Sequence, residues 1–148
     1  MFSSIKTKIY DGVDPNYPKL NGTYFSGGAG LSSTAEDYAK FMQVIINKGE
    51  FNGIRVLSRK TVELMLTNQV QPPLTNQFGL GFGLETETND HVSVASKGSF
   101  NWGGAYGTDY WGDPQEQLVL LIYTNVYAYD SRDFRQKFRT LVYSAIED

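Results

Sequence analysis

Residues 99–114 read Ser-Phe-Asn-Trp-Gly-Gly-Ala-Tyr-Gly-Thr-Asp-Tyr-Trp-Gly-Asp-Pro, so that bulky aromatic residues alternate with glycines. Glycine weakens a strand and is typical of places where a ligand or another backbone comes close. An apolar stretch from Leu118 to Thr124 follows the Asp-Pro turn. The pattern predicts a glycine-rich strand that either a ligand or a neighbouring strand or helix approaches, followed by a mostly buried strand.

Helical patterns flank this region on both sides. Ser33 and Glu36 fit a capping box for a helix that ends at Gly49, and its apolar stripe contains Tyr38, Phe41, Met42 and Ile45. Ser58 fits the cap of a second helix that runs to about Asn68. A last helix is expected to begin near Asp130 or Ser131, with one apolar stripe made of Phe134, Phe138, Leu141, Val142 and Ala145.

Short strand signals lie between the helices. Asn52-Gly53 between apolar residues predicts a tight hairpin. Residues 78–84 alternate large side chains with glycine, which predicts a strand, and residues 92–96 favour another short one. The strands are close together without crossover helices, so we expect an α+β fold with an antiparallel sheet flanked by helices. We expect one domain over residues 1–148, with residues 1–26 as an irregular lead-in.

Composition excludes several kinds of partner and cofactor. A net charge of -3 and a pI near 5.1 provide no basic surface for nucleic acid or an anionic membrane. The absence of cysteine excludes disulfides and thiolate sites, and a single histidine, His91, excludes a site with several histidines. We therefore expect no metal and no cofactor. Residues 1–8 contain no apolar run long enough for a signal peptide or a membrane span, and the compartment is not readable from the sequence.

Three segments in order resemble the carboxy-terminal half of the serine β-lactamase and penicillin-binding-protein-like hydrolases, in the class C-related branch that includes the family VIII esterases. They are residues 27–49, which begin Gly-Gly-Ala-Gly-Leu-Ser-Ser-Thr-Ala-Glu-Asp-Tyr, residues 53–65, which begin Gly-Ile-Arg-Val-Leu-Ser, and residues 102–125, which begin Trp-Gly-Gly-Ala-Tyr-Gly-Thr. The resemblance covers roughly residues 22–146. It implies a serine hydrolase that cleaves an ester, amide or β-lactam through an acyl-enzyme.

By position, Trp102-Gly103-Gly104 resembles the Lys-Thr-Gly-like strand of that family. The resemblance implies that a small-molecule acyl substrate lies along this strand, and that the backbone amide of Ala105 completes the oxyanion hole. Tyr106 is a candidate substrate contact, although an aromatic residue in a hairpin is also explained by packing. Trp102 stands where many β-lactamases have Lys or His, so the cation that pairs with a substrate carboxylate is missing. Esters or amides without that anion are then favoured over penicillins.

The family's nucleophile and tyrosine motifs are not convincingly present. Residues 3–6 fit Ser-x-x-Lys but precede an extended or turn-forming sequence rather than an amphipathic helix, and residues 123–125 fit Tyr-x-Asn at the end of a strand. We interpret both matches as chance. The chain is therefore expected to be a hydrolase fragment that is inactive alone, and that self-associates or pairs with the missing half. The alternative is a non-catalytic binding or interaction domain derived from the same fold.

Overall fold

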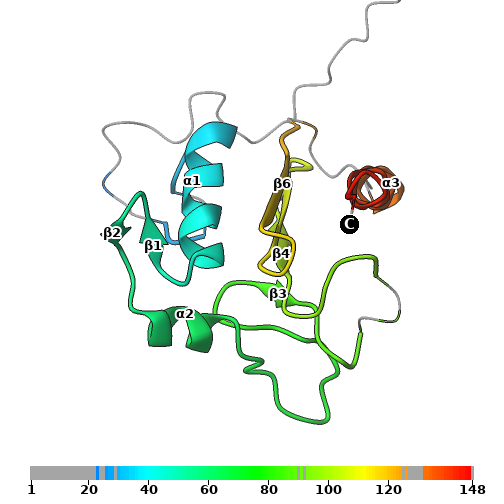
Figure 1. Cartoon of the computed structure of the whole chain (residues 1–148), viewed down its shortest axis with the longest axis horizontal. Helices are drawn as coiled ribbons and strands as arrows, with labels where there is room; N and C mark the ends of the chain where they lie inside the picture. Colours follow the sequence, from blue (N-terminus) through cyan, green and yellow to red (C-terminus); the bar gives the residue numbers. More distant parts are fainter. Residues whose placement is uncertain are drawn as a thin grey trace, which may run out of the picture. The chain divides into compact units, whose positions relative to one another are not determined.

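Helix α1 (Ala35–Ile46) and helix α3 (Arg132–Tyr143) lie on opposite faces of a four-stranded antiparallel sheet in the computed structural model (Figure 1). The structure describes residues 23, 26–28, 30–89, 91, 93–124, 126 and 132–147. The arrangement confirms the expected α+β class. Residues 1–33 and 34–148 form separate units, and every helix and strand among the described residues belongs to the second. The lead-in predicted for residues 1–26 lies outside the described residues except at positions 23 and 26, and the single domain stays a prediction.

Helix α1 begins one residue later than the sequence predicts. The cap is Thr34 rather than Ser33, because the Thr34 hydroxyl accepts a hydrogen bond from the Asp37 amide at 3.1 Å. The Asp37 carboxylate also accepts a hydrogen bond from this hydroxyl, so Asp37 takes the place expected for Glu36. At the other end Gly49 has the predicted left-handed conformation, with φ of 97°.

The segment after α1 forms the predicted hairpin and second helix. Strands β1 (Glu50–Phe51) and β2 (Ile54–Arg55) pair across Asn52-Gly53, whose φ values of 50° and 77° suit a two-residue turn. The Ser58 hydroxyl caps helix α2 (Arg59–Met65) by accepting from the Thr61 amide at 3.0 Å. Helix α2 ends earlier than the predicted Asn68.

The main sheet has the strand order β3-β4-β5-β6, in which each neighbouring pair is antiparallel. Its strands are β3 (Gly83–Leu84), β4 (Phe100–Gly103), β5 (Asp109–Asp113) and β6 (Leu118–Ile122). Strand β4 contains the glycine-rich motif, and β6 is the apolar strand predicted from Leu118 onward. Both strand predictions are confirmed.

Residues 78–84 do not form the single alternating strand that their pattern predicts. Only Gly83–Leu84 is a strand, and Phe78 forms a bridge with Gly83 because the chain turns back between them. Gly81 has φ of 92°, which bends the chain in a way that a regular strand does not allow. A side chain at Gly79 would clash with the Met65 carbonyl. Gly79 and Gly81 therefore allow the chain to turn close to α2.

Two further predictions are wrong in part. Residues 93–96 form no strand, and Val92 lies outside the described residues. Helix α3 directs Phe138 and Val142 to the sheet, but Phe134 and Leu141 are exposed, so the predicted apolar stripe is only half covered. No helix in the described part of the chain is both long and apolar enough to cross a membrane.

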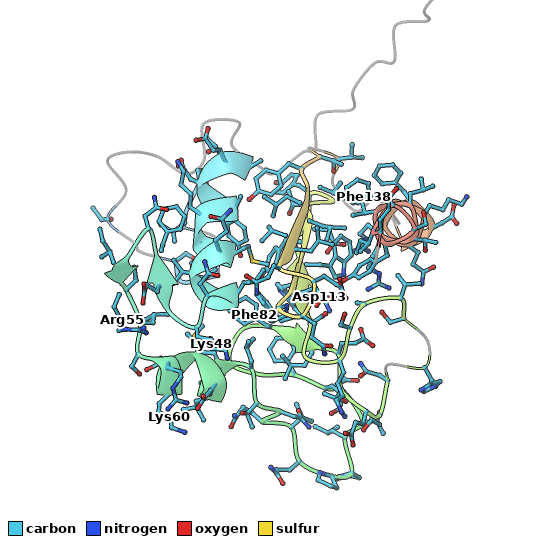
Figure 2. All side chains as sticks on the ribbon, viewed as in Figure 1. Lys48, Arg55, Lys60, Phe82, Asp113 and Phe138 are labelled. Atoms are coloured by element: carbon cyan, nitrogen blue, oxygen red, sulfur yellow. The ribbon has the colours of Figure 1, made fainter. Side chains whose placement is uncertain are left out.

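Each face of the sheet has its own apolar core, as the side chains in Figure 2 show. On the α1 face, Met42 and Ile45 pack with Phe82 and Phe100, and Phe100 has no exposed surface. Burying side chains of this kind stabilises the fold by about 1.5–3 kcal/mol each. The α3 face is built around a second cluster, in which Trp111, Leu120 and Ile122 pack against Phe138 and Val142. The alternation of side chains along β5 and β6 supplies both cores.

Candidate functional site

Strand β4 is paired along its whole length on one side but only partly on the other. Phe100, Asn101, Trp102 and Gly103 all pair with β5. Strand β3 pairs only with Phe100 and Asn101. Within the described residues, the β4 edge at Trp102 and Gly103 therefore has no neighbouring strand. An open strand edge is a place where an extended ligand can bind through main-chain hydrogen bonds.

The turn after β4 is held firmly. The Gly104 amide donates to the Thr108 carbonyl at 2.9 Å, and the Gly107 amide donates back to the Gly104 carbonyl at 3.1 Å. The Tyr106 carbonyl accepts from the Thr124 hydroxyl at 2.7 Å and from the Val126 amide at 3.0 Å. These bonds fix the turn to the chain that follows β6.

Ala105 lies in this turn, and its side chain is exposed. Its amide donates to no residue in the part of the chain that the structure describes. Hydrogen bonds of an antiparallel strand alternate between its two sides. Because Gly104 bonds toward β5, the backbone groups of Gly103 are directed to the open edge. Gly103 and Ala105 thus offer the backbone groups near this edge that remain available to a ligand.

The Trp102 side chain stands on the α1 face of the sheet. Its indole is 51% exposed and meets the Phe78 ring edge-on, with the ring centroids 4.9 Å apart. Across the strand pair its partner is Tyr110, whose ring is 4.8 Å from the Tyr38 ring. The wall beside the open edge is therefore aromatic, and the indole still has a free surface for a further apolar group.

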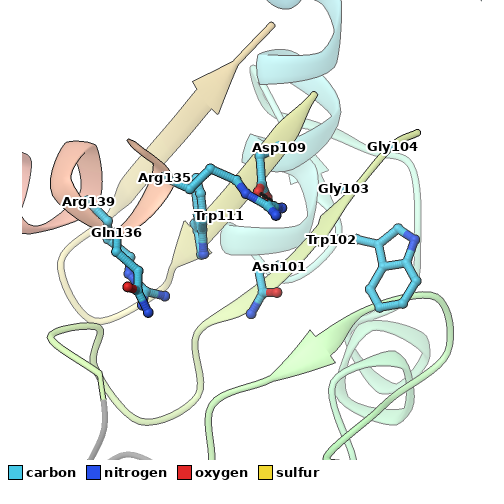
Figure 3. A pocket seen from close by; sticks show the side chains of 9 residues that line it. All are labelled: Asn101, Trp102, Gly103, Gly104, Asp109, Trp111, Arg135, Gln136 and Arg139. Carbon is cyan, nitrogen blue, oxygen red and sulfur yellow. Dashed lines mark hydrogen bonds and ion pairs between the residues drawn. The ribbon is translucent and has the colours of Figure 1, made fainter. Parts of the chain in front are cut away.

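A cavity of about 440 Å³ lies on the other face of β4, beneath α3 (Figure 3). Asn101 and Trp111 are cross-strand partners on β4 and β5. Figure 3 shows that the Trp102 indole is directed away from both of their side chains. Six residues give the cavity its chemistry: Asn101, Gly103, Asp109, Trp111, Arg135 and Arg139.

An ion pair closes one end of the cavity. Asp109 on β5 is 3% exposed and is paired with the Arg135 guanidinium of α3. Burial raises the pKa of the Asp109 carboxyl above its usual value, and the hydrogen bond and charge of Arg135 oppose that rise. The pair joins α3 to β5, the strand that also contains Trp111, so its first role is to hold the helix on the sheet.

Most of the predicted site residues lie together in the structure. Trp102, Gly103 and Gly104 form the end of β4 and its exit, and all three also contribute to the cavity wall. Ala105 and Tyr106 follow in the turn. Sequence reasoning missed the residues on the α3 face. The sequence did contain a signal for them. Asp109 and Trp111 are two residues apart and therefore share one face of β5, and Arg135 and Arg139 are four residues apart and therefore share one face of a helix.

The other chemical candidates stay outside this site. Lys97 pairs with Glu87 on the surface, and His91 is exposed. The Ser-x-x-Lys match at residues 3–6 lies outside the described residues, as does Asn125 of the Tyr-x-Asn match. In the described part of the chain, no group of acidic residues and histidine could hold a metal ion.

Comparisons with known proteins give a consistent result. A family model described as Beta-lactamase matches residues 4–143. An uncharacterised protein of Mycobacterium tuberculosis is 32% identical over 114 residues, which cover 67% of this chain and 28% of that protein. An N-acetylmuramyl-L-alanine amidase of Bacillus subtilis is 31% identical over 133 residues, which cover 84% of this chain and 28% of the amidase.

A solved structure agrees with these sequence matches. EstCE1, a hydrolase with promiscuous acyltransferase activity, matches with a TM-score of 0.67 and 25% identity, over 80% of this chain and 32% of EstCE1. The chain therefore spans about 28% of the length of the curated relatives it matches, and about a third of this solved structure.

Proposed function

This chain belongs to the β-lactamase family, and on that premise we propose that it forms one wall of the acyl-binding site of a serine hydrolase that cleaves an ester, amide or β-lactam. The observation that carries the proposal is the open edge of β4 at Trp102 and Gly103, followed by the amide of Ala105, which donates to no described residue. An acyl-transfer site needs a strand edge to align the substrate and a fixed N–H group to receive the developing negative charge. Both features occur within four residues of sequence.

In this proposal the substrate lies along the open edge, with its carbonyl oxygen at the Ala105 amide. Gly103 and Gly104 have no side chains, so the substrate can come within hydrogen-bonding distance of the backbone. The turn keeps the Ala105 N–H in place because Gly104 and Tyr106 on either side of it are bonded to Thr108, Thr124 and Val126. A donor fixed before the reaction needs no reorganisation when the oxyanion forms.

The nucleophile is expected to come from outside this wall. The sequence contains a Ser-x-x-Lys match only at residues 3–6, which we interpret as chance. We therefore propose that this chain alone does not form an acyl-enzyme. A serine-directed fluorophosphonate probe checks this directly: labelling of the purified 148-residue chain would overturn the proposal.

Trp102 carries the substrate preference. A penicillin carboxylate gains from a cation at this position, whereas the half-exposed indole beside Phe78 offers an aromatic surface instead. We propose that the complete site prefers uncharged esters or amides, since an unpaired substrate carboxylate beside apolar rings is unfavourable.

The experiment uses the full-length protein that contains this sequence. It is expected to hydrolyse p-nitrophenyl butyrate in preference to nitrocefin. Ala105→Pro removes the proposed N–H donor and should lower kcat by roughly 100- to 1,000-fold, whereas Ala105→Gly keeps the amide and should retain most of the activity. Equal activity of the Pro and Gly variants would remove Ala105 from the site. Efficient nitrocefin hydrolysis without esterase activity would contradict the substrate preference.

A second candidate is a non-catalytic interaction domain, which the open edge of β4 at Trp102 and Gly103 also suits. Such a domain would bind an extended peptide along the open β4 edge. It differs from the first candidate in one measurable way, because full-length protein would then show neither esterase nor nitrocefin activity.

A further inference from the structure

The cavity between β4 and α3 contains more positive than negative charge. Two guanidinium groups, of Arg135 and Arg139, line it together with one carboxylate, that of Asp109. Arg135 is committed to Asp109 through the ion pair. Arg139 forms no ion pair with any residue that the structure describes. The cavity therefore has one guanidinium in excess.

The guanidinium of Arg139 forms no hydrogen bond with any residue that the structure describes. Its guanidinium carbon lies over the Trp111 ring, 5.6 Å from the ring centre. Its Nε atom is buried and has no hydrogen-bond partner among the residues that the structure describes. A buried donor without an acceptor is destabilising. A planar acceptor with two oxygens, placed in the plane of the guanidinium at its terminal Nη groups, would offset the excess charge.

The other walls suit a small organic body attached to that acceptor. Asn101 faces the cavity from β4, and its side chain bonds to no described residue, so its amide is available to a ligand. The absence of a side chain at Gly103 leaves space in the cavity, because a Cβ there would lie 3.4 Å from the nearest Arg135 nitrogen. Trp111 provides an apolar surface. A volume of about 440 Å³ is within the range of small-ligand sites.

We propose that this cavity binds a small organic monocarboxylate, with the carboxylate on Arg139, a hydrogen bond from Asn101 and the organic body against Trp111. A single negative charge matches the single unpaired guanidinium. The site goes beyond the proposed hydrolase wall and does not depend on it, since Asn101 and the Trp102 indole lie on opposite faces of β4.

Benzoate is the probe, added to the ¹⁵N-labelled chain at constant ionic strength and followed by NMR. The indole N–H of Trp111 and the side-chain amide of Asn101 should shift with saturable binding, and benzamide, the uncharged analogue, should bind at least about tenfold more weakly. Arg139→Gln should weaken benzoate binding by about tenfold or more. Asn101→Ala removes no packing contact from the core and should weaken it by roughly threefold.

Lys137→Gln is the matched control, because it removes the same charge from the same helix at an exposed position outside the cavity. Its affinity for benzoate should equal that of the parent chain. The proposal is overturned if benzamide binds as tightly as benzoate, if Lys137→Gln and Arg139→Gln weaken binding equally, or if only inorganic phosphate binds. The proposal is also overturned if neither Asn101→Ala nor Arg139→Gln lowers the affinity for benzoate.

Discussion

The phenol of Tyr143 on α3 donates a 2.6 Å hydrogen bond to the carboxylate of Asp113, the last residue of β5. Asp113 has no exposed surface. It also accepts hydrogen bonds from the backbone amides of Ser96, Gln115 and Glu116. One buried carboxylate thus joins the last helix, the loop before β4 and the turn between β5 and β6. The relationship explains how the glycine-rich strand is held in place from outside the sheet.

Replacing Tyr143 with Phe should destabilise the fold. The change removes one donor from a buried carboxylate and leaves the ring in place, so the free energy of unfolding should fall by about 1.5–3 kcal/mol. Urea denaturation followed by circular dichroism measures this change. Tyr123→Phe is the matched control, since Tyr123 is 40% exposed and its hydroxyl bonds to no described residue. Its effect should stay within about 0.5 kcal/mol.

The same carboxylate predicts a loss of stability in acid. Burial alone would raise the pKa of Asp113, but the hydrogen bonds from Tyr143, Ser96 and Glu116 outweigh burial and hold it below its usual value. Because the unfolded chain then binds the proton more tightly, stability is fully present above the unfolded pKa of about 3.9 and falls as pH drops through the folded value. The unfolding free energy should therefore decrease as the pH falls from about 5 to about 2. Tyr143→Phe should show a smaller decrease, and an identical decrease in both proteins would contradict the assignment.

A substitution at Gly112 tests the packing of β5 against the α1 face. A Cβ at this position would overlap the ring of Phe100, its cross-strand partner, which is fully buried. Gly112→Ala should lower the free energy of unfolding by about 3 kcal/mol, because the ring has no space into which it can move. Gly27→Ala introduces the same methyl group with no atom of a described residue within 4 Å and should leave stability unchanged. Equal urea midpoints for the two variants would show that the core at Phe100 is loosely packed.

Local signals predicted most of the helices and strands of this fold. The Asn52-Gly53 turn, the Ser58 cap and the apolar strand from Leu118 all depend on neighbouring residues, and the structure confirms them. The predictions fail where contacts with a distant segment determine the local conformation. Residues 78–84 alternate as a strand does, but Gly81 turns the chain so that Phe78 meets Gly83 and Trp102.

The candidate site was predictable only on one face of one strand. Residues 102–106 are continuous in sequence, so their motif indicated the strand and its turn. The cavity behind them was not predictable, because Arg135 and Arg139 reach it only after α3 has packed across β5. A stripe of apolar residues predicted that α3 would cover the sheet. It could not indicate that the polar residues between them would line a cavity.

The last prediction concerns Trp102 in the full-length protein. Trp102→Lys replaces an uncharged aromatic wall with a cation beside the open edge of β4, where the carboxylate of a β-lactam would be attracted. The ratio of kcat/KM for nitrocefin to that for p-nitrophenyl butyrate should rise by about tenfold, the value of one hydrogen bond to a charged group. Trp102→Gln removes the indole without adding charge, so it separates the electrostatic effect from the loss of the Phe78 contact. If both variants change the ratio equally, the indole excludes β-lactams by its shape rather than by the absence of charge, and the proposed basis of specificity is wrong.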